Sequence, residues 1–445
     1  MRSLQVREYA TLTTDTNLAA NMDVGVVSQA TFDWLLDLHQ RWSGQAKLLS
    51  IEGRQRLKLG SYVGYLQSPA GEAIEILPKT ETTTPAEVET LRSLLQTMLR
   101  ASPDLHSREA EQATLRATNQ PLHEWIMGEF LSELSELLRR GLRFDYQTVE
   151  EECRFIRGQL DINRQLRQTP DKATRFHIRY AEFNPQRHEN RLLRSALDEV
   201  FRRTTNNDHW RLANALRQQF MDIEPHPEPA QGLPQWDNGK QLQSYRGVKP
   251  WCRLVLESLN PHFQKGPLQG IALLFPMERL YENYLGKCLL SQIKPDRSIK
   301  AQSSSQYLLS HQAEGADEVS QWFRLKPDFL VTMGGVNHLV LDAKWKLLDA
   351  ALDSSDHKYN ISQADLYQML AYGQRYLDGK GDLVLIYPGH MAFQKPLPMF
   401  SYTDELRVWA MPFDLQRGCL IHDDCIDDFY QNNKQKTGQE LQKKI

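Results

Sequence analysis

The first eighty residues carry short apolar runs separated by turn-forming residues. Residues 61–67 and 73–79 are two such runs, and the Ser-Pro-Ala-Gly segment 68–71 lies between them. Runs of this length, bounded by proline, glycine and serine, are typical of β-strands. We therefore predict a β-rich N-terminal domain over residues 1–82, folded as a small barrel or sandwich.

The spacing of apolar residues changes to that of helices after a polar connection at 80–85. Apolar side chains recur with helical periodicity in residues 88–95 and again in 125–138. The sequence therefore predicts a mixed, largely helical middle domain over residues 83–265.

The C-terminal part has another order of elements. A helical pattern at 276–285 precedes two apolar strands, and a second helical pattern at 362–372 precedes a short buried strand at 382–388. Helix, hairpin, helix and strand in this order are typical of a PD-(D/E)xK restriction-endonuclease-like α/β core. We place this core at residues 266–430, so the expected class is a multidomain α+β protein. The remaining polar, lysine-rich residues predict a frayed tail, 431–445.

The two apolar strands of this core predict a hairpin that carries acidic residues. One strand is expected over 323–331 and the other over 338–345, with the turn at 334–337. If the turn centres on Gly335, Asp328 and Asp342 are cross-strand partners and lie close together. Lys344 follows Asp342 by two residues and so points to the same face.

Two carboxylates beside an ammonium group suit a metal-dependent phosphodiesterase. Carboxylate oxygens bind Mg²⁺ or Mn²⁺, and a neighbouring lysine can orient a phosphate or an attacking water. An Asp-x-Lys sequence is commonly just a solvated surface, but here the acids interrupt apolar strands, where an unpaired carboxylate is costly. We expect Asp328, Asp342, the Ala343 carbonyl and Glu282 to hold the metal. Glu278, one helical turn before Glu282, is an alternative upstream acid.

The helix expected at 362–372 supplies further candidates. It contains the pattern QxxxY twice, as Gln363/Tyr367 and as Gln368/Tyr372. Residues four apart share one helix face, so Gln368 and Tyr372 are predicted to support the catalytic groups Asp328, Asp342 and Lys344. Packing in the core is the alternative role for the tyrosine.

Composition and charge restrict the possible partners. The net charge is −3, hydrophobic residues make up 40% and charged residues 24%, values that are ordinary for a globular protein and give no overall nucleic-acid signal. Arginines recur between Arg139 and Arg194, where they could meet phosphate or form a solvated face balanced by the glutamates at 150–152. Five scattered cysteines predict free thiols and a cytoplasmic location, with no membrane association. The chain has no P-loop motif, so we expect it to bind no nucleotide itself.

These motifs together resemble the McrC family, the nuclease subunits of McrBC modification-dependent (type IV) restriction systems. The short core motifs are weak one by one, but their joint order is specific. The segments that carry the resemblance are 64–67 (GYLQ), 74–79 (IEILPK), 140–142 (RGL), 156–161 (IRGQLD), 190–193 (NRLL), 280–282 (LYE), 327–328 (PD), 342–344 (DAK), 366–372 (LYQMLAY) and 386–388 (IYP).

The resemblance implies an antiviral restriction endonuclease that cuts double-stranded DNA with Mg²⁺. It also implies an McrB-like partner, a hexameric AAA+ GTPase that recognises modified cytosine and that this chain would stimulate. Whether the partner uses GTP or ATP stays open. Two alternatives also remain: a non-catalytic activator or assembly platform of the ring, and a stand-alone RecB-like exonuclease. We expect docking on the ring within residues 1–260, where Arg139, Arg140 and Arg157 are candidates for touching the ring or DNA.

Overall fold

The computed structural model describes residues 4–42, 47–80, 85–102, 105, 120–172, 174–259, 270–314 and 318–421. These residues form helices and several separate sheets, which confirms the expected α+β class. Among the helices of these ranges, none is long and apolar enough to cross a membrane. The predicted polar tail, 431–445, lies outside the described residues.

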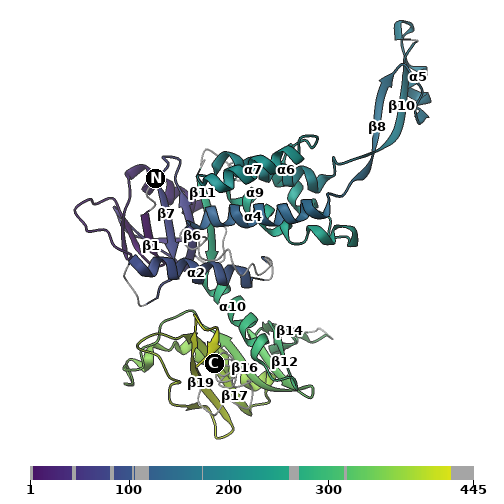
Figure 1. Cartoon of the computed structure of the whole chain (residues 1–445). Coiled ribbons are helices and arrows are strands. Elements are labelled where there is room, and N and C mark those ends of the chain that lie inside the picture. Colours follow the sequence, from purple (N-terminus) through teal and green to yellow (C-terminus); the bar gives the residue numbers. More distant parts are fainter. Residues whose placement is uncertain are drawn as a thin grey trace, which may run out of the picture.

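Two four-stranded sheets and a helix make up the N-terminal part (Figure 1). The apolar runs at 61–67 and 73–79 are confirmed as two of the strands, and both sheets contribute to one hydrophobic core together with the helix. The first sheet has the order β1 (Leu4–Arg7), β7 (Ala73–Leu77), β6 (Tyr62–Gln67), β11 (Ile271–Pro276); the second has the order β3 (Val24–Val26), β2 (Thr11–Thr13), β5 (Arg56–Leu59), β4 (Leu49–Gly53); the helix is α1 (Gln29–Arg41).

Strand β11 joins this sheet although it lies some two hundred residues further along the chain. It pairs antiparallel with β6, and Gly64 of β6 has a φ of +143°. A Cβ at Gly64 would lie 1.9 Å from the carbonyl oxygen of Leu273, so only glycine permits this close approach. The division of the chain near residue 265 stays a prediction, but β11 ties the residues that follow to the N-terminal sheet.

The middle part is a group of packed helices, as the helical periodicity predicts. Helix α4 contacts α7 and α9, and α6 contacts α7 and α9, around a continuous apolar core. The helices are α2 (Pro85–Ala101), α4 (Leu122–Arg140), α6 (His188–Arg203), α7 (Asn207–Gln219), α8 (Pro229–Gly232) and α9 (Val248–Leu259).

An arm projects from these helices between α4 and α6 (Figure 1). It is built from β8 (Asp145–Cys153), β10 (Phe176–Asn184), the short strand β9 (Gln159–Leu160) and the one-turn helix α5 (Ile162–Leu166). Strands β8 and β10 pair antiparallel along their whole length, from Asp145↔Asn184 to Cys153↔Phe176. No periodicity in the sequence predicted this arm.

A mixed sheet with a helix on each face forms the C-terminal part. Its apolar side chains alternate, so that Leu339 and Leu341 pack with α10 while Val340 packs with α11. The strands follow the order β12 (Arg297–Ala301), β15 (Phe329–Met333), β16 (Val336–Ala343), β17 (Gly381–Pro388), β19 (Leu406–Asp414), β18 (Phe400–Ser401), with β20 (Cys419–Leu420) beside β19; the helices are α10 (Met277–Gln292) and α11 (Gln363–Tyr376).

The predicted hairpin is present, but its turn and both of its strands have other bounds than expected. Its turn is the two-residue Gly334–Gly335, both at positive φ, which is the turn that suits the twist of paired strands. The expected single strand 323–331 is wrong: β14 (Ser320–Leu325) pairs only with β13 (Gln306–His311), and β15 starts afresh at Phe329. Pro327, which has no N–H for a ladder bond, lies at this break. The returning strand ends at Ala343, so Lys344 lies just beyond it.

Candidate active site

The hairpin brings Asp328 and Asp342 together at one end of the sheet. Its register pairs Phe329 with Leu341, and one more step along the same register places Asp328 opposite Asp342. The Asp328 carboxylate accepts a hydrogen bond of 2.7 Å from the backbone N–H of Ala343, next to Asp342. Asp342 itself is only 1% exposed and shares the α11 side of the sheet with Val340. The expected convergence of the two acids therefore matches the structure.

Lys344 reaches back from the end of β16 to Asp342. Its ammonium lies 2.6 Å from Asp342 Oδ2 and 3.6 Å from Asp365 Oδ1, and it donates to Gln368 Oε1 over 3.0 Å. Its backbone N–H is held by the carbonyl of Ile386 in β17 at 2.9 Å. The sheet therefore positions the main chain of this lysine, while α11 and Asp342 position its charged end.

Helix α11 brings one of its two QxxxY pairs to the site. Gln368 donates from Nε2 to the Tyr372 hydroxyl over 2.7 Å, and that hydroxyl donates to the backbone carbonyl of Lys326 over 3.0 Å. Tyr372 is buried in the core behind Gln368, and burial raises the pKa of its hydroxyl well above the usual range. The protonated hydroxyl of Tyr372 thus links α11 by a hydrogen bond to the segment that leads to Asp328. Gln363 and Tyr367 bond to each other, and Tyr367 is exposed.

The two upstream acids of α10 have different neighbours. Glu282 accepts a hydrogen bond of 2.7 Å from Gln302 Nε2, and the backbone N–H of Gln302 bonds the Asp328 carbonyl. The charge of Glu282 raises the pKa of both aspartates, whereas the charge of Glu278 raises the pKa of Glu8 in the N-terminal part. Glu282 is therefore the better candidate for the upstream acid.

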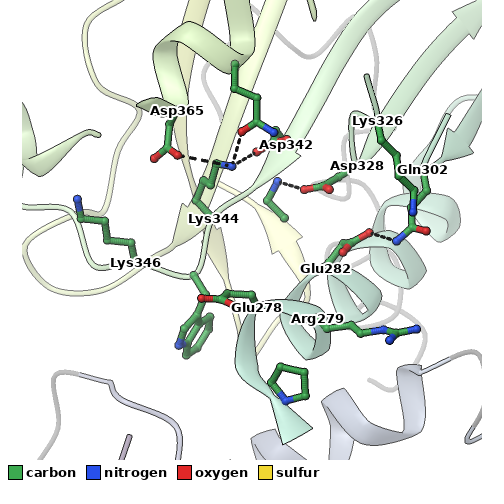
Figure 2. Close-up of a pocket in the computed structure, with 14 residues that line it drawn as sticks. Glu278, Arg279, Glu282, Gln302, Lys326, Asp328, Asp342, Lys344, Lys346 and Asp365 are labelled. Atoms are coloured by element: carbon green, nitrogen blue, oxygen red, sulfur yellow. Dashed lines mark hydrogen bonds and ion pairs between the residues drawn. The ribbon is translucent and has the colours of Figure 1, made fainter. Parts of the chain in front are cut away.

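The two aspartates, Lys344, Gln368 and the acids of α10 border one open cavity of about 580 Å³, whereas Tyr372, Gln363 and Tyr367 do not (Figure 2). Its wall carries both signs of charge and receives residues from α10, the hairpin and α11. The lining residues are Pro276, Glu278, Arg279, Glu282, Gln302, Lys326, Asp328, Asp342, Ala343, Lys344, Trp345, Lys346, Asp365 and Gln368.

Lys344 does not fully neutralise the buried Asp342 and the half-buried Asp328. Burial, and then the charges of Asp342 and Glu282, raise the pKa of Asp328 far above that of an ordinary aspartate. Burial also raises the pKa of Asp342, against the opposing effect of Lys344. For Lys344, burial acts against the charged form, but the contact with Asp342 outweighs it and raises the lysine pKa. The site therefore has a net demand for positive charge.

A divalent cation fits this demand. The donors are all oxygens, which Mg²⁺ and Mn²⁺ prefer. Within the described ranges no three His, Cys, Asp or Glu side chains are grouped closely enough to hold a metal by themselves. An Mg²⁺ ion here would take two aspartates and complete its shell with a backbone carbonyl, Glu282 or water, in keeping with the waters that Mg²⁺ usually retains.

Several cavity residues were not singled out from the sequence. Asp365 lies three residues before Gln368, so helical spacing could have indicated it. Gln302 and Lys326 come from segments without a motif, and only the fold shows that they border the cavity.

Two solved structures that this chain resembles come from Thermococcus gammatolerans. A chain of the refined half-complex from the tetradecameric assembly of Thermococcus gammatolerans McrB AAA+ hexamers with bound McrC matches with a TM-score of 0.67 and 18% identity, covering 93% of this chain and 95% of that one. A chain of the Thermococcus gammatolerans McrBC complex matches with a TM-score of 0.48 and 19% identity, covering 65% and 87%. No curated protein matches the sequence.

The family assignment rests on the sequence model rather than on these folds. The model described as "McrBC 5-methylcytosine restriction system component" matches residues 57–388, most of the chain and all of the acids and the lysine at the cavity. The expected family is therefore confirmed: this chain belongs to the McrBC 5-methylcytosine restriction system component family.

Proposed function

We propose that this chain is the Mg²⁺-dependent endodeoxyribonuclease of an McrBC-type restriction system, activated by an AAA+ ring. The observation that carries the proposal is the cluster of Asp328, Asp342 and Lys344 in one cavity, where Lys344 contacts the buried Asp342 and its charge also acts on the half-buried Asp328. The sequence of elements α10, β15–β16 hairpin, α11 and β17 supports a PD-(D/E)xK type of core. A non-catalytic platform would have no need to keep two costly acids beside a lysine.

Each residue of the cluster has a role that its contacts support. Mg²⁺, held by Asp328, Asp342, the Ala343 carbonyl and Glu282, would polarise the scissile phosphate and lower the pKa of a bound water. The Lys344 ammonium is aimed into the same cavity and would stabilise negative charge that develops on the phosphate. Gln368 keeps this ammonium in place through its amide oxygen, and Tyr372 keeps Gln368 in place.

The substrate we propose is double-stranded DNA, with modified cytosine recognised by the partner. Arg279 and Lys326 border the cavity and can meet phosphates on either side of the cut. The chain as a whole carries a net charge of −3, so it would depend on the partner to hold the DNA.

The arm is the element we propose for docking on the ring. It has exposed apolar side chains in unusual number, including Phe155 (78% exposed), Leu166 (81%) and Tyr146 (71%). Residues 145–184 contain seven Lys and Arg and seven Asp and Glu, so the arm has no net charge. A charge-balanced surface with large exposed apolar groups suits a protein partner better than a phosphate backbone.

The arginines expected to touch the ring or DNA are largely paired within the chain. Arg139 and Arg140 both contact Glu136 at the end of α4. On the arm, Arg157 approaches Glu151 and covers the ring of Tyr180, and Arg179 binds Glu150. This pairing is the solvated, balanced face that the sequence left open as an alternative, and it makes the apolar residues the stronger docking candidates.

Replacing Asp342 tests the metal site. Asp342→Asn keeps the shape of the side chain but removes a charged ligand, so cleavage of DNA should be abolished. Mg²⁺ should raise the melting temperature of the wild type, because a ligand that binds the native state stabilises it, and this shift should be lost in the variant. Thermal melts and cleavage assays with an McrB-type ring measure both.

Asp382→Asn is the matched control, since Asp382 lies at the opposite end of the sheet and binds Arg407 and Trp409. Cleavage at the wild-type rate by Asp342→Asn would contradict the nuclease assignment. A wild type that stimulates the ring but never cuts DNA would support the platform alternative.

Lys344→Ala should slow cleavage by about 10²- to 10³-fold, the usual effect of removing one preorganised electrostatic contact. The Mg²⁺ concentration that gives half of the thermal shift should not increase, because the lysine is no metal ligand. Lys346→Ala is the control: it borders the same cavity, but its ammonium is bonded to the Asn360 carbonyl. A parallel loss of Mg²⁺ binding would mean that Lys344 is structural.

Gln368→Ala should lower the cleavage rate by about 10- to 100-fold, as expected for a group that orients a neighbour. The loss should be smaller than that of Asp328→Ala, which removes a proposed metal ligand. Gln363→Ala belongs to the other QxxxY pair and should have no effect. Equal rates for the Gln368 and Gln363 variants would refute the supporting role.

Polar substitutions on the arm test docking in the full-length chain. Phe155→Ser combined with Leu166→Ser should weaken stimulation of the ring's NTPase by at least about tenfold, because exposed apolar anchors dominate protein interfaces. Met221→Ser, an exposed apolar residue at the end of α7, is the control. Melting temperatures should stay unchanged, since both arm residues are exposed. Full stimulation by the double variant would place docking elsewhere.

A further inference from the structure

Glu8 is a buried carboxylate of the N-terminal sheet that contacts the nuclease site. It follows β1 directly and is 0% exposed. One of its oxygens, Oε1, accepts two hydrogen bonds: 2.6 Å from the indole N–H of Trp345 and 2.9 Å from the backbone N–H of Lys79. Trp345 is the residue after Lys344, so this bond joins segments 337 residues apart at the edge of the catalytic cavity.

The position of Trp345 bears directly on Lys344. Strand β16 ends at Ala343, and beyond it Lys344 has one main-chain bond to β17. The Trp345 ring lies 5.2 Å from that of Tyr281, the neighbour of Glu282 in α10. The indole is thus placed between the helix that carries the upstream acid and the N-terminal sheet, and it anchors the chain where Lys344 leaves the sheet.

Close packing alone does not fix the contact between Glu8 and Trp345. A second cavity, of about 470 Å³, lies beside it and is lined by Glu8, Tyr9, Lys79, Trp345, Lys346, Leu347 and Pro388. On that side the indole has open space, so the hydrogen bond to Glu8 determines its orientation. Where packing is incomplete, such a bond decides among several possible side-chain positions.

Burying the Glu8 carboxylate at this contact is also unfavourable, unlike the burial of an apolar side chain. Burial raises the pKa of Glu8 to about 7, with a further contribution from the charge of Glu278. Its second oxygen, Oε2, has no hydrogen-bond partner among the described residues. A buried polar atom without a hydrogen-bond partner destabilises the native state.

The N-terminal sheet is also connected to the site through the chain itself. Strand β11 passes directly into α10, with Pro276 as the boundary, and the first N–H of the helix bonds the carbonyl of Ser61 next to β6. The N-terminal sheet therefore places Glu282 through the covalent chain and Lys344 through Glu8 and Trp345.

We propose that Glu8 is a positioning residue of the nuclease site. Through its hydrogen bond to Trp345, Glu8 holds Lys344 close to Asp342, so cleavage depends on the contact between the N-terminal sheet and this site. The inference rests on the proposed nuclease function. Glu8 lies before residues 57–388, the part that the family model matches, so the family assignment does not imply it.

The test uses the full-length chain with Mg²⁺ and an McrB-type ring. Glu8→Ala and Trp345→Phe each remove one partner of the bond, and each should lower the cleavage rate by about 10- to 100-fold. The double variant should be no slower than the slower single variant, because both changes break the same interaction. Glu8→Gln keeps the oxygen that accepts the hydrogen bond, so its cleavage rate should stay within about threefold of the wild-type rate.

Three further measurements separate positioning from general damage. Stimulation of the ring's NTPase and the Mg²⁺-dependent thermal shift should be unchanged in all four variants, because docking and the metal ligands are untouched. Trp409→Phe removes an equivalent indole-to-carboxylate bond, 2.8 Å to Asp382, at the far end of the same sheet and should cut normally. If Glu8→Ala does not fold, Trp345→Phe and Glu8→Gln decide the question.

The outcomes are distinct. Wild-type cleavage by Trp345→Phe, with Asp342→Asn inactive, overturns the role of Glu8 and leaves the nuclease assignment intact. Slow cleavage by Trp409→Phe to the same extent also overturns it, since any lost indole bond would then suffice. Cleavage by Asp342→Asn refutes the nuclease assignment itself, whatever the Glu8 variants do.

Discussion

The shortage of positive charge around Asp328 and Asp342 is the constraint on which the C-terminal part depends. Two acids are held in an apolar sheet by a hairpin, and one lysine cannot neutralise them both. Gln368 and Asp365 of helix α11 also contact that lysine, and Glu282 of α10 adds a further negative charge near the two acids. An uncompensated carboxylate in an apolar environment is costly, and the cation of the proposed function would offset that cost, which would give the stability and the chemistry of this part the same origin.

The sequence predicted this centre well because its determinants are local. A turn at Gly334–Gly335 set the register that places Asp328 opposite Asp342, and helical spacing selected Gln368 and Tyr372. Lys344 lies just beyond the strand but still contacts Asp342. One local error occurred, the merging of 323–331 into a single strand, and Pro327 was the signal that argued against it. The structure brings these residues together at the end of one hairpin.

What could not be predicted depends on distant partners or on surface shape. The polar, charge-balanced strands of the arm have no buried face, so neither apolar alternation nor helical period reveals them. Glu8 and Trp345 carry no motif, and their contact spans 337 residues, so nothing in their neighbourhoods indicates it. Strand β11 has the apolar run of a strand, but its partner β6 belongs to another part of the chain. Pairings of this kind are decided by tertiary packing rather than by local propensity.

The pairing of β6 with β11 also constrains how the chain is made. Until Ile271–Pro276 leaves the ribosome, β6 is an unprotected edge of an otherwise complete sheet. At about 5–20 residues per second, the two hundred intervening residues take roughly 10–40 s to synthesise. An open edge strand can pair with other chains during that interval. The N-terminal sheet is thus finished late, when α10 and the C-terminal sheet begin to form, so assembly of the two parts is linked by the order of translation.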